Sequence, residues 1–339
     1  MDVKNNILEI EHLQTQFRVG RKKVYAVNDV SLTVKRGHTL GIVGESGCGK
    51  SVTAHSILQL LPQNGTITGG SILFAPDADS PVMQLQKMKR TGKEIRAVRG
   101  QKIAMIFQDP LSSLNPVYTI GYQIMENLKL HEKGISKEEA KARIIDLLGK
   151  LGIPEPAQRY NEYPHQFSGG MKQRVMIAIA MICNPGLLIA DEPTTALDVT
   201  IQAQILRLMK QLKEDFGTSI ILITHNMGIV AEACDEVAVM YMGRVVESGT
   251  KRQIFANPQH PYTRALLRSV PVPGMPEDKE LDSIPGSTPD ASIRFDHCEF
   301  QPRCEHACGR CMDGFPPVYE CEPGHMVRCF VKEGARQHD

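Results

Sequence analysis

A short apolar strand that runs into a glycine-rich loop and then a helix limits the folds open to this chain. Residues Leu40 to Val43 form the apolar run, the loop GESGCGKS spans Gly44 to Ser51, and apolar side chains recur at helical spacing from Val52 to Leu61. Glycine lets backbone N–H groups converge on phosphate oxygens, and the helix N-terminus adds a favourable dipole. The loop fits G-x-x-x-x-G-K-[ST], which predicts Lys50 at the β- and γ-phosphates and Ser51 on magnesium. A glycine turn without a ligand is the alternative, and the flanking strand and helix disfavour it.

Two acids follow another apolar strand. Leu187 to Ala190 read as a buried strand, and Asp191 and Glu192 stand at its carboxyl end, where ligands bind in open parallel sheets. Asp191 suits a magnesium role, and Glu192 is placed to polarise a water for attack on the γ-phosphate. The alternative is a strand end with its acids in solvent.

Two more polar residues end apolar strands. Gln108 follows the run Ile103 to Phe107, before Asp109-Pro110, and such a glutamine alone is usually a hydrogen-bonding residue at a strand edge. His225 ends the run Ser219 to Thr224, and a lone histidine there is more often structural than catalytic. Its order after the two acids favours a sensor of the γ-phosphate. Downstream of Gln108, Ser136 and Glu139 form a capping box that predicts a packed surface helix.

Composition excludes several classes of protein. A chain of 339 residues with 42% hydrophobic and 23% charged residues has room for one large domain and an extension, and a net charge of +1 gives no sign of a nucleic-acid surface. The most apolar runs, such as Val175 to Cys183, fall short of the roughly 18 residues needed to span a bilayer. Because no basic stretch followed by an apolar run opens the sequence, we expect no signal peptide. We therefore expect a cytoplasmic protein that reaches a membrane only through a partner.

Taken in order, the motifs resemble a complete ATP-binding cassette over residues 7 to about 255. They are GESGCGKS, Gln108, FSGGMKQR (167–174), LLIADEP (187–193), the segment Thr195 to Asp198, and His225. The resemblance implies an α/β fold: a RecA-like P-loop core with an antiparallel β subdomain, a helical subdomain at about 110–175, and a small cysteine-rich C-terminal extension. Because prolines thicken from Pro258 onward, we expect the cassette to occupy 1–256 and the extension 257–339.

The family assigns a role to each matching position. The ATP-binding set would be Tyr25, Gly44, Ser46, Gly47, Cys48, Gly49, Lys50, Ser51 and Val52. Magnesium would be held by Ser51, Gln108 and Asp191, with Glu192 as general base, His225 as γ-phosphate linchpin and Gln108 also at the transmembrane coupling interface. Signature residues Ser168, Gly169, Gly170 and Gln173, with Asp198 in the D-loop, would face nucleotide held by a partner. Phe17 is the alternative to Tyr25 for stacking on adenine.

Two departures from the family pattern are small. Phe167 stands where leucine is commoner, and Asn226 stands where aspartate is usual. Neither removes a phosphate-contacting or acid–base group, so we expect an active ATPase that needs Mg²⁺. The signature implies that it is incomplete without a second cassette.

Three longer segments are similar to the ATP-binding subunits of bacterial dipeptide and oligopeptide importers: FQDPLSSLNP (107–116), YPHQFSGGMKQR (163–174) and NPQHPYTRALL (257–267). This implies a peripheral subunit at the cytoplasmic face of the cell membrane. Its partners would be a second, non-identical cassette, two transmembrane permease subunits and, indirectly, an extracytoplasmic solute-binding protein. Importers of nickel share these segments, so the solute stays open.

Two rival functions differ in class. A soluble cassette acting on DNA or ribosomes usually carries two fused cassettes or a long coiled coil, and neither is apparent in the sequence; near-neutral charge also disfavours it. The other rival is a metal-sensing subunit whose cysteine-rich end sets the ATPase rate.

Six of the nine cysteines lie between Cys298 and Cys329. A reducing compartment argues against a disulfide framework and favours metal. The pattern Cys298-x5-Cys304-x6-Cys311 with Cys329 resembles the C-terminal motif of the peptide importers, where four thiolates are associated with a 4Fe-4S cluster. Zinc is the alternative, through Cys308, Cys311, Cys321 and Cys329 or with His306 or His325, and thiols without metal are the third. In each metal case we expect a structural role.

Overall fold

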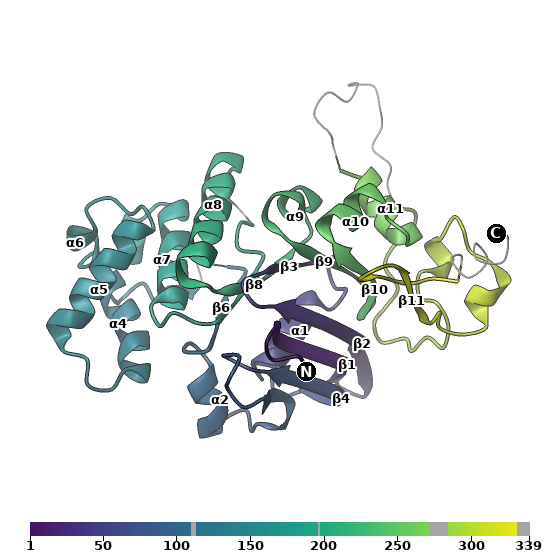
Figure 1. Cartoon of the computed structure of the whole chain (residues 1–339), viewed down its shortest axis with the longest axis horizontal. Coiled ribbons are helices and arrows are strands. Elements are labelled where there is room, and N and C mark those ends of the chain that lie inside the picture. Colours follow the sequence, from purple (N-terminus) through teal and green to yellow (C-terminus); the bar gives the residue numbers. More distant parts are fainter. Residues whose placement is uncertain (110–112, 196, 271–283, 331–339) are drawn as a thin grey trace.

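The computed structural model describes residues 1–109, 113–195, 197–270 and 284–330. Pro110 and Ala196, which belong to the motifs above, lie outside these ranges. A parallel α/β core occupies the centre of the molecule, with an antiparallel β layer beside it, a helical bundle at one end and the C-terminal region at the other (Figure 1). The predicted α/β cassette fold is confirmed.

The central sheet is parallel around β3 and turns antiparallel at one edge. Its order runs β10-β9-β3-β8-β7-β6, and β9, β8, β7 and β6 follow the direction of β3. Every residue of β3, β7 and β8 is buried, as expected for strands covered on both faces. The strands are β3 (Thr39–Val43), β6 (Ile103–Ile106), β7 (Leu187–Asp191), β8 (Ser219–Thr224), β9 (Glu236–Tyr241) and β10 (Arg244–Thr250).

The antiparallel layer is built from β1 (Asn6–Val19), β2 (Lys22–Lys35) and β4 (Gly65–Phe74), with the short β5 (Met83–Gln84) at its edge. Stretches of β1 and β2 alternate buried with exposed residues. The buried face packs on α1 (Lys50–Ile57), which follows the phosphate loop. A 3-10 turn (Leu85–Lys87) and α2 (Lys93–Val98) complete this part of the molecule.

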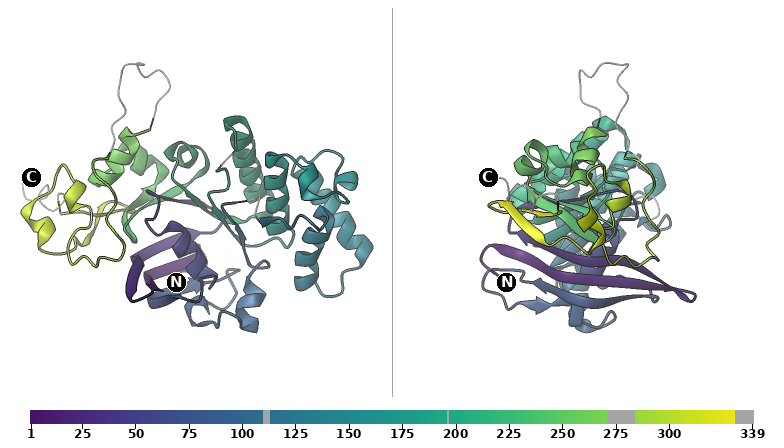
Figure 2. Two further views of the ribbon diagram at one scale, coloured as in Figure 1. Left: turned by 180° about the vertical axis from the view of Figure 1, so that it is seen from behind. Right: turned by 90° about the vertical axis from the view of Figure 1, so that its right-hand side faces the viewer.

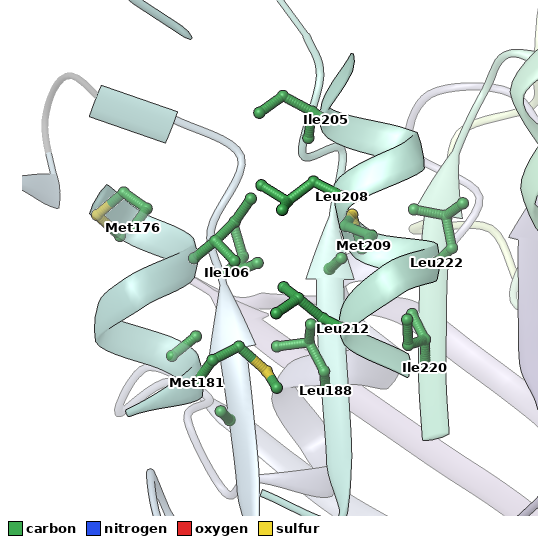
Figure 3. Close-up of a cluster of buried hydrophobic side chains, with 14 of the residues drawn as sticks. Ile106, Met176, Met181, Leu188, Ile205, Leu208, Met209, Leu212, Ile220 and Leu222 are labelled. Atoms are coloured by element: carbon green, nitrogen blue, oxygen red, sulfur yellow. The ribbon is translucent and has the colours of Figure 1, made fainter. Parts of the chain in front are cut away.

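Two long helices cover one face of the sheet. They are α7 (Gly169–Met181) and α8 (Val199–Phe216). Figure 3 shows Met181 of α7 and Leu208 and Leu212 of α8 directed at strand residues such as Ile106 and Leu188. This packing holds α7, which begins at the signature residues Ser168, Gly169 and Gly170, against the core.

The remaining helices of this end form a bundle. It contains α4 (Ile120–His131), α5 (Lys137–Lys150), α6 (Pro156–Arg159) and a 3-10 turn (Pro164–Gln166), and it projects from one end of the molecule (Figure 2). The Ser136 hydroxyl caps α5 by accepting from the Glu139 N–H at 3.1 Å, where the capping box predicts a helix start. Within the described ranges no helix has the length and apolarity needed to cross a membrane.

The C-terminal region returns to the central sheet. Strand β12 (His325–Arg328) pairs antiparallel with β10, matching Val327 with Glu247, and β11 (Val318–Glu322) pairs with β12. Helix α10 ends at Ala256, close to the predicted domain boundary, which stays a prediction. The elements are α9 (Met227–Ala233), α10 (Lys251–Ala256), α11 (Pro261–Arg268), 3-10 turns at Gln301–Arg303 and Gly309–Met312, β11 (Val318–Glu322) and β12 (His325–Arg328).

A buried carboxylate fastens this region to the core. The Glu247 side chain accepts hydrogen bonds from the N–H groups of Gln259 (2.7 Å) and His260 (2.8 Å) and lies 2.7 Å from Nε2 of His325. Burial raises the pKa of Glu247, but these bonds, led by His325, outweigh it and leave the pKa below its ordinary value. A buried carboxylate is tolerated when its oxygens are satisfied in this way. Glu247 therefore acts as a clamp between β10, the start of α11 and β12.

Candidate functional site

The phosphate loop needs glycine because backbone atoms crowd it. Gly44 has φ 151° and a Cβ there would lie 2.2 Å from the Met240 carbonyl oxygen. Gly49 has φ 101° and a Cβ would lie 2.3 Å from the carbonyl oxygen of Ala26. Both positions therefore exclude a side chain on steric grounds as well as through backbone conformation.

Lys50 is the first residue of α1, and its ammonium group folds back over the loop. The side chain is buried, and Nζ donates to the carbonyl oxygens of Gly44 (2.7 Å) and Glu45 (2.9 Å). Gly49, which has no side chain, is the N-cap of the helix. The first-turn N–H groups and the ammonium group together form a site of positive potential that suits a phosphate.

Ser51 and Asp191 meet from two different elements. The Ser51 hydroxyl donates to Oδ1 of Asp191 across 3.0 Å, and Asp191 is buried at the end of β7. Burial raises the pKa of Asp191, an effect that a cation would oppose. Adjacent oxygens around octahedral Mg²⁺ lie about 2.9 Å apart, given bonds of roughly 2.0–2.1 Å. The chemistry and spacing of this pair therefore fit a magnesium ion.

Glu192 gathers three further side chains. Its Oε2 accepts from Gln108 Nε2 (3.1 Å) and Thr195 Oγ1 (2.9 Å), and its Oε1 lies 3.0 Å from His225 Nδ1. Burial raises the pKa of Glu192, but the hydrogen bonds from His225 and Thr195 outweigh it, so the pKa is lowered. The group is an anion at neutral pH and can accept a proton. Its backbone, at φ 46°, is held in the left-handed region that is sparsely populated for such a residue.

Strand register explains why these residues meet. Ala190 pairs with Ile106 of β6 and with Leu222 of β8, so the three strands end at nearly the same level. Gln108, Glu192 and His225 each follow the end of one of them, and the sequence-predicted trio is brought together. Thr195, quoted above only as part of a motif, is an additional contact of the Glu192 carboxylate.

The signature residues lie at the start of α7, away from these contacts. Ser168 is its N-cap and accepts from the Met171 N–H, and a Cβ on Gly170 would lie 2.8 Å from Ile201 of α8. Gln173 is fully buried, and its amide has no hydrogen-bond partner within the described part of the chain. Asp198 caps α8 by accepting from Ile201 N–H at 2.9 Å. Within the described ranges, neither Ser168 nor Gly170 forms a hydrogen bond with the phosphate loop.

Of the two aromatic candidates for adenine stacking, Tyr25 lines a cavity. This cavity has a volume of about 810 Å³ and lies between the antiparallel layer and the C-terminal region, with Arg294 on its wall 5.9 Å from the Tyr25 ring centre. Phe17 instead packs tightly on Gly65, within the sheet. The carbonyl oxygen of Ala26, the residue after Tyr25, lies against Gly49 of the phosphate loop. Tyr25 is therefore close to that loop in the structure. The role of Tyr25 stays a prediction.

The C-terminal cysteines only partly converge. Cys298 is partly buried, and this burial, with smaller contributions from Cys311, Glu299 and Cys329, raises its pKa to about 12. The sulfurs of Cys308 and Cys311 are 3.5 Å apart. However, in the part of the chain that the structure covers, no three His, Cys, Asp or Glu side chains are grouped to hold a metal ion. Thiol donors are therefore present, but they do not form a ligand set for iron–sulfur or zinc here.

Comparisons with known proteins identify the family of the chain. Residues 27–195 match the ABC transporter family, and residues 246–311 match the oligopeptide/dipeptide transporter C-terminal region. The chain is 48% identical over 326 residues to the oligopeptide transport ATP-binding protein OppD of Salmonella typhimurium, covering 96% of this chain and 94% of the relative. It is 45% identical over 333 residues to the dipeptide transport ATP-binding protein DppD of Bacillus subtilis, covering 98% and 96%.

Solved structures show the same fold. The ATP-binding cassette MJ0796, in a dimeric post-hydrolysis state bound to ADP and Pi, superposes with a TM-score of 0.63 at 28% identity, over 72% of this chain and 99% of that one. The cbiO1 structure from Clostridium perfringens superposes with a TM-score of 0.62 at 28% identity, over 75% and 92%. The chain therefore belongs to the ABC transporter family of ATP-binding cassettes.

Proposed function

We propose that the chain is the ATP-hydrolysing subunit of a bacterial importer of dipeptides or oligopeptides. The proposal rests on the Glu192 carboxylate, which contacts the side chains of Gln108 and His225. Glu192 directly follows Asp191, whose carboxylate contacts Ser51. A base, a magnesium-binding pair and a phosphate loop thus share one edge of the sheet. The solute class is supported by the names of the relatives and by the C-terminal region that they match.

Each residue of the site would have a separate role in ATP hydrolysis. Lys50 and the first turn of α1 bind the β- and γ-phosphates, with the rest of the loop around them. Ser51, Asp191 and Gln108 would hold Mg²⁺, which neutralises phosphate charge when bound. Glu192 accepts a proton from the attacking water, and His225 holds the carboxylate in place and reaches toward the γ-phosphate. The lowered pKa of Glu192 keeps it in the form that accepts the proton.

Each cassette would need a second one. Ser168 and Gly170 lie at the start of α7. Within the described ranges they make no hydrogen bond to the chain's own phosphate loop. We therefore assign them, with Gly169 and the D-loop Asp198, to nucleotide held by a partner cassette. A non-identical sister subunit is the partner we favour, with Tyr25 as the stacking residue for each chain's own adenine.

Exposed aromatic side chains mark a surface suited to a permease subunit. Tyr118 and Tyr122 stack on each other with ring centres 4.6 Å apart, and both are about half exposed on the helical bundle. Tyr122 also lines a groove of about 550 Å³, whose wall combines apolar residues such as Leu130 with charged ones such as Lys129. Exposed apolar patches of this kind mark protein contacts. Binding there would hold the chain peripherally at the cytoplasmic face of the membrane.

For the cysteines we propose a structural 4Fe-4S cluster on Cys298, Cys304, Cys311 and Cys329. Its support is the sequence pattern and the thiol chemistry alone. Protein purified without oxygen should be brown, absorb near 400 nm, and contain iron and sulfide. Stoichiometric zinc without iron would refute the cluster.

Transport tests the proposal directly. The chain should co-purify with two membrane-spanning subunits, and the complex in proteoliposomes should take up labelled di- or oligopeptides when ATP is supplied on the cassette side. Glu214→Gln, an exposed acid on α8, is the control for Glu192→Gln, which should stop uptake. Co-purification with ribosomes or DNA, or uptake of nickel but not of peptides, would refute the assignment.

A further inference from the structure

Glu45 lies inside the phosphate loop, and its atoms are held by residues of the C-terminal region. Its N–H donates to the Tyr262 hydroxyl at 2.9 Å, and its carboxylate accepts two hydrogen bonds from Arg303, at 2.7 and 2.9 Å. Its carbonyl oxygen accepts from Lys50 Nζ at 2.9 Å. A single loop residue thus connects the C-terminal region to the lysine expected at the phosphates.

The Arg303–Glu45 pair is well built. The Arg303 side chain is 4% exposed and that of Glu45 is 27% exposed, and the two-pronged contact is the strong form of an arginine–carboxylate pair. The Nε of Arg303 donates to the carbonyl oxygen of Pro285 at 2.8 Å. Removal of Glu45 would leave a buried guanidinium group without its counter-charge, which is strongly unfavourable.

An aromatic platform supports both anchors. The rings of Tyr241, Tyr262 and Phe300 pack with centres 4.8 to 5.3 Å apart. The N–H of Arg303 donates to the Phe300 carbonyl oxygen at 3.0 Å, so the arginine leaves the platform from a short turn. Because these rings are almost fully buried, Arg303 and the Tyr262 hydroxyl have little freedom to move.

We propose that Arg303 and Tyr262 are positioning residues for the phosphate loop. They hold Glu45, and through it Lys50 and the loop backbone, in the conformation that receives the triphosphate. The inference rests on the proposed ATP site and adds the C-terminal region to it. A loop ordered in advance loses less conformational freedom when the ligand binds, so the effect falls on ATP affinity rather than on the chemical step.

The test measures KM and kcat for ATP in the full complex, together with the Kd for ADP. Arg303→Met removes the two hydrogen bonds and keeps an unbranched side chain; it should raise KM and Kd about tenfold and leave kcat within about twofold. Arg268→Met is the matched control, because Arg268 is an arginine of the same region whose ion pair with Glu305 is about half exposed. Its KM should stay at the parental value.

Because Arg303→Met could also loosen the C-terminal region, Glu45→Gln approaches the contact from the loop side. Under the proposal the double variant binds ADP no more weakly than either single variant, since all three lose the same bidentate ion pair between Arg303 and Glu45. Parental KM in both single variants, strictly additive effects, or a fall in kcat at constant KM would overturn the inference. Lys50→Ala distinguishes a failure of this inference from a failure of the proposed ATP site. Retained ATP binding by that variant would refute the ATP site itself.

Discussion

The Glu247 clamp predicts how far the free energy of unfolding falls when its carboxylate is removed. Glu247→Ala would leave the N–H groups of Gln259 and His260 and the Nε2 of His325 without the acceptor that they contact at 2.7–2.8 Å. Each buried donor left unsatisfied costs roughly 1–3 kcal/mol. Three of them, with some relief as water enters, lower the free energy of unfolding by about 4 kcal/mol. The same change should free the C-terminal region before the rest of the chain unfolds.

Urea unfolding followed by circular dichroism measures the loss, and limited trypsin digestion followed by mass spectrometry locates it. Glu236→Ala is the control, because its partner Lys35 is about half exposed, and it should cost less than about 1 kcal/mol. An unfolding free energy for Glu247→Ala within about 1 kcal/mol of the parent, with unchanged digestion, would refute the clamp.

The clamp also predicts a pH dependence. The folded-state pKa of Glu247 lies below its ordinary value of 4.5, so the stabilisation is fully present above 4.5 and is lost as pH falls through the folded pKa. The parent should therefore lose stability below pH 4.5 more steeply than Glu247→Ala. Parallel stability curves for the two proteins in acid would contradict the assignment.

Three further changes test the site. Gly49→Ala forces a Cβ to within 2.3 Å of the Ala26 carbonyl oxygen; it should abolish the rise in melting temperature that ATP gives the parent, and a retained rise would contradict the loop geometry. His225→Ala removes a hydrogen bond that lowers the pKa of Glu192, so the acidic limb of the kcat profile should move to higher pH; an unmoved limb would contradict the coupling. Tyr122→Arg should weaken permease co-purification at least tenfold without changing the melting temperature, and full recovery of permeases would exclude that surface.

Much of the site could be predicted because strand ends are visible in sequence. Gln108, Glu192 and His225 each follow an apolar run, and parallel strands bring their carboxyl ends to one edge. The loop glycines were equally visible, because phosphate-binding backbone has a fixed spacing.

The contacts of the C-terminal region could not be predicted in the same way. Glu45 occupies a variable position of the loop motif, and its partner Arg303 is 258 residues away, so no spacing rule connects them. In the sequence, Glu247 is one more acidic residue of a strand. Only the fold shows that β12 and the turn at Gln259 cover its carboxylate. Cysteine spacing indicated a metal, but the folded positions of the thiols depend on loops that carry no periodic signal.

The central claim is that Glu192 is the base of an ATPase completed by a second cassette. The most direct measurement is single-turnover hydrolysis of ATP by the assembled complex carrying Glu192→Gln. We predict a rate at least about 100-fold below the parent, with ATP still bound and the two cassettes trapped together, since the amide keeps the shape of the carboxylate but cannot accept the proton. Hydrolysis at the parental rate would contradict the account.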